Sequence, residues 1–261
     1  MRISLATIPR PWLIRISYWV SPVLAFYYKG NKFEDPIDGR TYRKLLPYGY
    51  GKLQRENALA PGSLSLERHR LLWLYLKEHL NFDNNSHSAA NAPVKKVLHV
   101  APEQCFLHLF KKIKSIEYIT GDLDSPIADI KMDLHNIPFD DNTFDVILCN
   151  HVLEHVQDDK KCMREIFRTL KPGGWAIMQV PQNIRAEKTD EDPTITDPQE
   201  RIRRFGQYDH VRMYGRDYPQ RLKNAGFNVE EIDMVKQLGR EKSDSYGLNG
   251  ELLYVCHKPA T

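Results

Sequence analysis

Short apolar runs alternate with amphipathic stretches from Val94 to the end of the sequence, and this alternation constrains the fold more than any other feature. Such a pattern is typical of a parallel sheet whose connecting helices cover both faces. It predicts an α/β fold with a mostly parallel sheet. The strands are expected at residues 94–100, 117–122, a short stretch ending at 133, then 144–150, 174–181, 227–235 and 251–258.

The segment from Met132 to Pro181 carries the clearest family signal. It reads as loop, buried strand, helix, glycine turn and buried strand. Acidic and polar residues stand where the strands end, which is where parallel sheets bind ligands. The run resembles the D-x-x-x-x-P-F-x-D-x-x-F-D-x-V … L-x-P-G-G pattern of class I S-adenosylmethionine (SAM) dependent methyltransferases of the type 11 kind. This resemblance implies a Rossmann-like sheet of seven strands in the order 3-2-1-4-5-7-6, with the seventh strand antiparallel.

Length and composition allow one α/β domain and an accessory segment, because the chain has 261 residues of which 41% are hydrophobic. The net charge of +3 gives no sign of nucleic acid as a partner. The four cysteines show no metal-ligand spacing. This favours free thiols in a reducing compartment such as the cytoplasm.

We predict three parts along the chain. Residues 1–80 form an N-terminal segment that ends in a helix with Ser65 as its N-cap. Residues 81–93 are small and polar, as in a linker. Residues 94–261 form the SAM-binding domain, to which the resemblance mainly applies.

The stretch from Arg10 to Tyr28 is apolar and aromatic, with Arg15 as the only charged residue after Arg10. Three interpretations remain open: a helix docked on the protein's own core, an interfacial anchor at a membrane surface, or a membrane span. Ser21-Pro22 is expected to break the segment. Peripheral membrane contact through residues 10–28 is therefore an alternative, and the oligomeric state is left open.

Two short motifs in the N-terminal segment are spaced like the cysteine pairs of a zinc ribbon. They are D-P-I-D at residues 35–38 and A-P-G-S at residues 60–63, each in the place of C-P-x-C. A subgroup of SAM methyltransferases is similar here, with cysteine pairs followed by the same S-L-E-R-H-R helix start. Two aspartates cannot complete a four-ligand zinc site, so we predict a ribbon-like fold without metal; coincidental spacing is the alternative. Its expected stabilising residues are Tyr42, Leu45, Leu46 and Tyr48.

The first strand of the sheet runs into the sequence V-L-H-V-A-P-E, where class I methyltransferases usually carry acid-x-Gly-x-Gly. His99 stands in the place of the acid, and Ala101 and Glu103 stand in the places of the glycines. The resemblance implies that His99, Val100, Ala101, Pro102 and Glu103 bind the methionine part of SAM. Backbone carbonyls are expected to accept from its ammonium, and Glu103 to supply negative charge at a helix N-terminus. The alternative is a non-catalytic site.

The resemblance places further cofactor contacts after the next three strands. The carboxylate after the second strand is expected to take the ribose hydroxyls, with Asp124 as the alternative carboxylate and turn capping as the structural alternative. An acid and a backbone amide after the third strand are expected at the adenine, and two residues after the fourth strand below the methyl donor. These residues are Asp122 and Leu123, Asp133 and Leu134, and Asn150 and His151.

His151, Glu154 and His155 form a candidate metal site. A set of metal-assisted O-methyltransferases holds a divalent cation with an acid-x-x-Glu-His run at this place. The Glu-His-Val run also occurs in metal-free relatives, where it packs and caps. We predict no metal.

Residues 181–218 form a long insert with an acidic first half and a basic, aromatic second half. In this fold such an insert covers the active site, so Tyr208, Arg212 and Tyr214 are predicted substrate contacts. Its arginines either grip an anionic group of the substrate or pair with the acids upstream. His210 is the predicted general base, because a neutral imidazole can take a proton near pH 7; the alternative is that it holds the insert in place.

These features predict methyl transfer from SAM to a small-molecule acceptor, at oxygen or nitrogen. One alternative is a non-catalytic SAM-fold binding module. Another is a membrane-surface methyltransferase that acts on a lipid-linked or sugar acceptor. A nicotinamide dehydrogenase is less favoured, because no G-x-G-x-x-G follows Val100.

Overall fold

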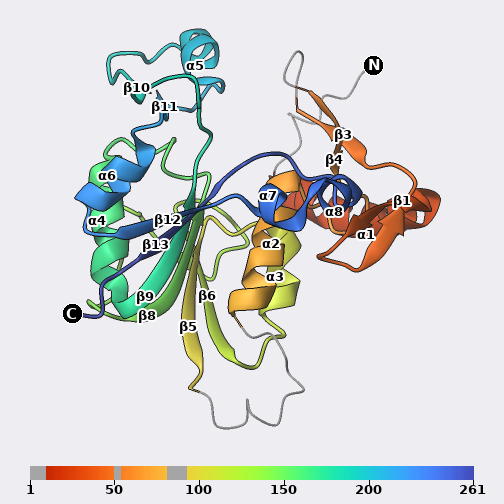
Figure 1. Cartoon of the computed structure of the whole chain (residues 1–261), viewed down its shortest axis with the longest axis horizontal. Helices are drawn as coiled ribbons and strands as arrows, with labels where there is room; N and C mark the ends of the chain where they lie inside the picture. Colours follow the sequence, from red (N-terminus) through yellow and green to blue (C-terminus); the bar gives the residue numbers. More distant parts are fainter. Residues whose placement is uncertain (1–9, 50–53, 81–92) are drawn as a thin grey trace. The chain divides into compact units, whose positions relative to one another are not determined.

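The chain divides into two units, each built from segments that are distant in the sequence. The computed structural model describes residues 10–49, 54–80 and 93–261 (Figure 1), so the predicted linker lies almost entirely outside the described residues. Two later segments group with the N-terminal part, whereas the prediction divided the chain into consecutive parts. The N-terminal unit comprises Met1–Asp83, Glu103–Lys112 and Asp233–Glu251, and the sheet unit comprises Asn84–Pro102, Ile113–Ile232 and Leu252–Thr261.

The sheet unit contains a seven-stranded sheet in the order β12-β13-β9-β8-β5-β6-β7. The predicted order 3-2-1-4-5-7-6 is therefore confirmed. Only the last strand in sequence, β13, runs antiparallel to its neighbours β12 and β9 within this sheet. The strands are β5 (Lys95–Val100), β6 (Ile116–Asp122), β7 (Ile130–Lys131), β8 (Phe144–Asn150), β9 (Leu170–Gln179), β12 (Asn228–Ile232) and β13 (Leu253–His257).

The register of the parallel strands brings their carboxyl ends to one edge. Val100, the last residue of β5, is paired with Gly121 of β6 and with Cys149 of β8. Asp122 at the end of β6 is paired with the end of β7, and Asn150 at the end of β8 with the end of β9. Parallel sheets bind ligands at this edge.

Helices α4 (Asp159–Thr169) and α6 (Tyr218–Asn224) lie on one face of this sheet (Figure 1). Helix α4 begins after Asp158, whose side chain accepts a hydrogen bond from the backbone of Lys161 (2.9 Å) and so caps the helix. Its buried side chains, Met163 and Ile166 among them, join the core that the strands form. The helix thus fixes the loop that connects it to β8.

The N-terminal unit combines helices with two short antiparallel hairpins. Trp73 of α2 packs against Phe106 and Phe110 of α3, with ring centroids 6.3 and 6.1 Å apart. The elements are α1 (Arg10–Tyr27), β1 (Lys29–Asp35), β2 (Arg40–Tyr42), β3 (Leu46–Tyr48), β4 (Arg55–Leu59), α2 (Glu67–His79), α3 (Gln104–Phe110), α7 (Met234–Leu238) and α8 (Arg240–Ser245).

Helix α2 starts one residue later than predicted. Leu66 is its N-cap, so the prediction for Ser65 is wrong. The imidazole of His69 reaches back and accepts the hydrogen bond of the Leu66 N–H (3.0 Å). Ser65 is buried instead, with its hydroxyl 3.4 Å from a carboxylate oxygen of Asp35.

The two predicted ribbon motifs meet through hydrogen bonds. Asp35 is buried, and its carboxylate accepts from the Ser63 hydroxyl and from the backbone of Ile37 (3.0 Å). Tyr42 is buried with Leu45 in a small core, as expected. Tyr48 is exposed, so its predicted stabilising role is wrong. Descent from a zinc ribbon stays a prediction.

Helix α1 runs through Pro22, so the predicted break at this position is wrong. A proline inside a helix costs about 3 kcal/mol, and docking of the inner face of α1 offsets this cost. Ser21 and Ala25 are buried, and Ser17 accepts a hydrogen bond from Gln104 of α3 (2.7 Å). The outer face of α1 stays exposed. Among the residues that the structure describes, no helix is long and apolar enough to cross a membrane.

Candidate active site

The loop after β5 has an unusual backbone conformation at Ala101, whose φ of 49° lies in the left-handed region. Glycine adopts this conformation without strain, which explains why the class I pattern has glycine at this place. The Ala101 N–H donates to the carbonyl of Gly121 (2.9 Å) and so ties the loop to β6. Pro102 is buried. Glu103 is the N-cap of α3 and belongs to the N-terminal unit.

His99, which stands in the place of the class I acid, is held inside the sheet unit. Its side chain is buried, and its Nδ1 lies 2.7 Å from the hydroxyl of Tyr118 on β6. The ring therefore links β5 to β6. The predicted contact of His99 with the cofactor stays a prediction. Tyr118 was missed because one aromatic residue in a strand carries no local signal for such a partner.

Asp122 takes the capping role that the sequence left open, and its contact with the ribose hydroxyls stays a prediction. Its Oδ1 accepts hydrogen bonds from the backbones of Asp124 (2.8 Å) and Ser125 (2.6 Å), so it caps the following turn. Its Oδ2 has no hydrogen-bond partner among the described residues and remains available for a ligand. Leu123 beside it is 55% exposed. An exposed leucine next to an acceptor oxygen at this edge suits one side of an adenine ring.

Asp133 follows β7 and is exposed. Its Oδ1 accepts from the backbone of His135 (2.9 Å) and lies 2.8 Å from the His135 ring. These hydrogen bonds lower the pKa of Asp133, so it is ionised near neutral pH. The side chain of Leu134 is buried in the core, which leaves only its backbone for a ligand.

Asn150 and His151 follow directly on β8. Asn150 is buried, and His151 has a φ of 53° with its N–H donated to the carbonyl of Gln179 (2.8 Å). The His151 ring lies 3.4 Å from Glu154. Burial alone would raise the pKa of Glu154, but the hydrogen bond and charge of His151 lower it overall.

Glu154, His155 and His210 bring one carboxylate and two imidazoles together, with ligand atoms within 4.8 Å of one another. The Nδ1 of His155 lies 3.3 Å from Asp209, and the Nδ1 of His210 lies 3.0 Å from the Phe205 carbonyl. Burial lowers the pKa of His210, so the ring is neutral near pH 7. Because Nδ1 lies beside a carbonyl oxygen, Nδ1 carries the proton and Nε2 can accept one. Such a group can move a proton or hold a divalent cation.

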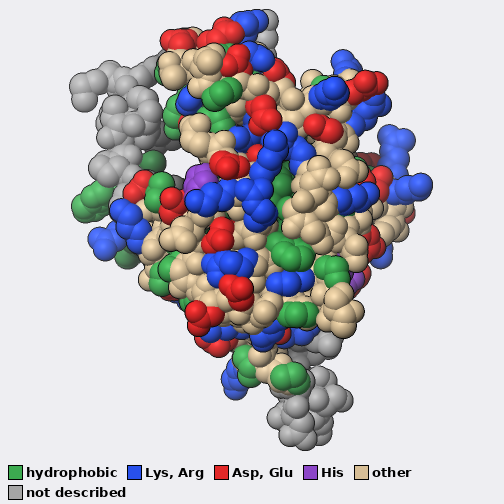
Figure 2. Space-filling model, turned by 90° about the vertical axis from the view of Figure 1, so that its left-hand side faces the viewer, with side chains coloured by type: hydrophobic (Ala, Val, Ile, Leu, Met, Phe, Trp, Pro, Cys, Tyr) green, Lys and Arg blue, Asp and Glu red, His purple; other side chains and the backbone are tan. Residues whose placement is uncertain are grey.

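The insert is held together by pairs between its acidic and basic halves. Arg204 binds Asp190 through two hydrogen bonds (2.8 and 2.6 Å) and Asp192 through a third (3.0 Å). Arg203 pairs with Glu200 (2.8 Å). On the face shown in Figure 2, basic and acidic side chains are likewise interspersed. The upstream acids therefore occupy these arginines, as the second of the two interpretations expected.

Arg212 is buried rather than presented to a substrate. Its guanidinium donates to the carbonyls of Leu153 (2.6 Å), Val156 (2.5 Å) and Gln157 (2.8 Å). It also donates to Glu191 (3.2 Å) between the paired antiparallel strands β10 (Asp190–Glu191) and β11 (Arg212–Met213). This corrects the predicted substrate role: Arg212 fixes the insert to the loop after β8.

Tyr214 is also buried, and its hydroxyl donates to Asp159 (2.9 Å). Arg221 of α6 binds the same carboxylate (2.8 Å). The predicted substrate contact of Tyr214 is thus corrected to a structural one, while Tyr208 is exposed. Sequence reasoning missed Asp159 and Arg221, because they meet only through folding of the insert.

Comparison with known proteins finds similarity to methyltransferases. Residues 84–178 match the family model described as "Methyltransferase domain". The ubiquinone/menaquinone biosynthesis C-methyltransferase UbiE of Idiomarina loihiensis is 49% identical over 49 residues, 19% of this chain and 20% of that protein. The sterol 24-C-methyltransferase erg6 of Schizosaccharomyces pombe is 29% identical over 137 residues, 51% of this chain and 35% of that protein.

Among solved structures, an S-adenosylmethionine dependent methyltransferase from Mesorhizobium loti is similar with a TM-score of 0.47 and 14% identity. The similarity covers 72% of this chain and 98% of that one. The chain spans less than half the length of each of the first curated relatives that it matches. The sheet unit thus has the strand order that is expected of SAM-dependent methyltransferases, and residues 84–178 match a methyltransferase domain, a class whose cofactor is SAM.

Proposed function

We propose that the protein transfers a methyl group from SAM to a small-molecule acceptor. One observation carries the proposal: the register of β5, β6 and β8 brings Val100, Asp122 and Asn150 to the same edge of the sheet. The match of residues 84–178 to a methyltransferase domain supports it. Bound SAM supplies an electrophilic methyl group on a sulfonium.

The carboxyl end of each of these parallel strands has a role in this proposal. Asp122 accepts hydrogen bonds from the ribose hydroxyls through Oδ2, since Oδ1 caps its own turn. Leu123 covers one side of the adenine, and Asp133 accepts from the adenine amino group. The backbone after β5 and at Asn150 holds the methionine part. Because the displacement is in line, positioning of the two reactants provides most of the rate enhancement.

His210 is the base in this proposal. Its Nδ1–H donates to a backbone carbonyl, and its lowered pKa keeps it neutral near pH 7, so Nε2 can take a proton from an acceptor hydroxyl or amine. The carboxylate of Glu154 then stabilises the imidazolium that forms. Oxygen or nitrogen is the methylated atom in this proposal.

A second candidate is methylation of carbon. The curated relatives described above carry C-methyltransferase in their names. A base is equally useful there, because a carbon nucleophile must lose a proton. The two candidates differ in the product: the new methyl group is attached to a heteroatom or to carbon, which NMR of the product distinguishes.

Titration of the full chain with S-adenosylhomocysteine in a calorimeter tests the cofactor site, with saturable binding expected. Loss of turnover in His210→Gln with unchanged cofactor affinity would support the base. Full turnover in that variant would refute the base assignment and leave the cofactor site standing. Binding with no methyl transfer to any acceptor tried would favour the non-catalytic binding module.

A further inference from the structure

One face of α1 is apolar and exposed. Because the helix has 3.6 residues per turn, the exposed apolar side chains occupy about a third of its circumference. The opposite face carries Ser21 and Ala25, which are buried in the N-terminal unit. Trp19 and Phe26 are each 83% exposed. The stripe consists of Trp12, Ile16, Trp19, Val20, Val23, Phe26 and Tyr27.

Single exposed apolar residues are common, but a contiguous stripe of this kind marks an interaction surface. Tryptophan and tyrosine are the residues that prefer the headgroup level of a bilayer. The guanidinium of Arg15 lies over the ring of Trp12, 5.9 Å from its centroid, at the border of the stripe. From such a border a long cationic side chain can reach lipid headgroups.

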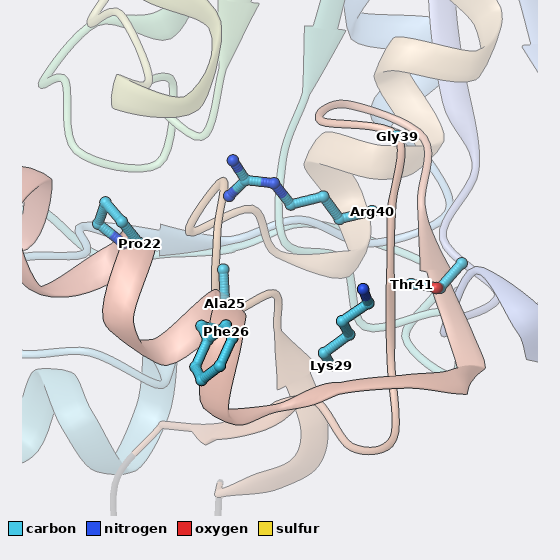
Figure 3. A pocket seen from close by; sticks show the side chains of 7 residues that line it. All are labelled: Pro22, Ala25, Phe26, Lys29, Gly39, Arg40 and Thr41. Atoms are coloured by element: carbon cyan, nitrogen blue, oxygen red, sulfur yellow. The ribbon is translucent and has the colours of Figure 1, made fainter.

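A basic cavity of about 440 Å³ adjoins the C-terminal end of α1. Figure 3 shows the ammonium of Lys29 and the guanidinium of Arg40 reaching into the space beside Phe26 and Ala25. The guanidinium of Arg40 forms a long ion pair with the carboxylate of Asp38, at 3.9 Å. Lys29 forms no ion pair with any described residue.

The charges around this end of α1 favour anions. Residues 12–33 contain Arg15, Lys29 and Lys32 but no aspartate or glutamate. Arg43 stacks on the ring of Tyr27, with its guanidinium carbon 4.8 Å from the centroid. The apolar stripe is thus bordered by cations, and an anionic surface complements it.

We propose that this face of α1 docks the protein on anionic phospholipid bilayers, with the stripe in the headgroup region and one lipid phosphate in the cavity of Lys29 and Arg40. The helix lies along the interface rather than across it. A second copy of the chain fits less well, because a two-fold contact would bring these cations close to their own copies. The inference goes beyond methyl transfer and does not depend on it.

Co-sedimentation of the full chain with phosphatidylcholine vesicles, with and without phosphatidylglycerol, tests the proposal. Wild-type protein should bind the anionic vesicles more tightly, and its tryptophan emission should shift to shorter wavelength. The double variant Trp19→Glu, Phe26→Glu should lose both signals. Both side chains are exposed, so circular dichroism of this variant should match the wild type.

A matched control is the double variant Val94→Glu, Ile184→Glu, which places the same two charges at exposed apolar residues of the sheet unit. This variant should bind vesicles like the wild type. Wild-type protein that stays in the supernatant with anionic vesicles would overturn the proposal. So would a Trp19→Glu, Phe26→Glu variant that binds as well as the wild type.

The double variant Lys29→Gln, Arg40→Gln tests the headgroup cavity. Each basic residue near an anionic surface contributes about fivefold to binding, so affinity for phosphatidylglycerol vesicles should fall about 25-fold. Affinity for pure phosphatidylcholine should not change. Equal affinity of the wild type for both vesicle types would refute the role of the cavity. A dimer in solution that Trp19→Glu, Phe26→Glu dissociates, without any vesicle binding, would show that the face is a contact between copies.

Discussion

Substitution of Asp35 by asparagine should stabilise the protein at neutral pH. Asp35 is buried between the two ribbon-like motifs, where it accepts hydrogen bonds from Ser63 and from the backbone of Ile37. The pKa of Asp35 is raised from 3.8 to about 6, mainly by burial and secondly by the charge of Asp38. Asparagine keeps one acceptor for Ile37 and gains an amide that donates to the Ser63 hydroxyl.

The size of the stability gain follows from the pKa shift of Asp35. A pKa raised from 3.8 to about 6 corresponds to about 3 kcal/mol of preference for the protonated form in the folded state. Well below pH 3.8 the carboxyl is protonated in both the folded and unfolded states, and no stability is lost. As the pH rises from 4 through 6, the folded state alone resists ionisation, so the free energy of unfolding of the wild type falls by about 3 kcal/mol.

Urea unfolding of wild type and Asp35→Asn between pH 4 and 8 measures this difference. The two proteins should be similar near pH 4, and the variant should be more stable by up to about 3 kcal/mol above pH 7. Asp140→Asn, which removes the same charge from an exposed side chain, controls for net charge. A constant difference across the whole pH range, or a less stable variant at pH 8, would refute the reasoning.

Three further predictions concern the sheet unit. Asp122→Asn keeps the acceptor that caps its turn but loses the charge and the second acceptor, so calorimetry should show affinity for S-adenosylhomocysteine reduced about tenfold or more; an equal loss in Asp124→Asn would contradict this. Arg212→Gln breaks the buried contacts to three carbonyls and should cost about 3 kcal/mol or more in urea unfolding, whereas Arg203→Gln at an exposed pair should change stability by less than about 0.5 kcal/mol. Chelation with EDTA should leave methyl transfer unchanged if His210 is a base; activity lost with EDTA and restored by Mn²⁺ would assign His210, with Glu154 and His155, to a metal instead.

The sheet could be predicted from the sequence because its signals are local and repeated. Buried strands such as β8 (Phe144–Asn150) are continuous apolar runs, and the predicted bounds of β8 are the observed ones. Residues that cap or end strands, such as Asp122, are likewise visible in a local pattern. The strand order came from the resemblance, and the structure confirms it.

The roles of side chains in the insert could not be predicted in the same way. Arginine is a residue type expected at a substrate contact, yet Arg212 donates hydrogen bonds to carbonyls more than 50 residues away in the sequence. Tyr214 and Arg221 converge on Asp159 from separate elements for the same reason. The continuation of α1 through Pro22 also depends on tertiary docking. This docking offsets the cost of a proline inside a helix, and the sequence alone shows only that cost.

We propose that SAM binds at the edge formed by β5, β6 and β8, and calorimetric titration of SAM into the full chain measures this binding. We expect saturable binding with one site per chain, weakened in Asp122→Asn and retained in His210→Gln. Absence of binding by the folded wild type, or binding that Asp122→Asn leaves unchanged, would contradict it.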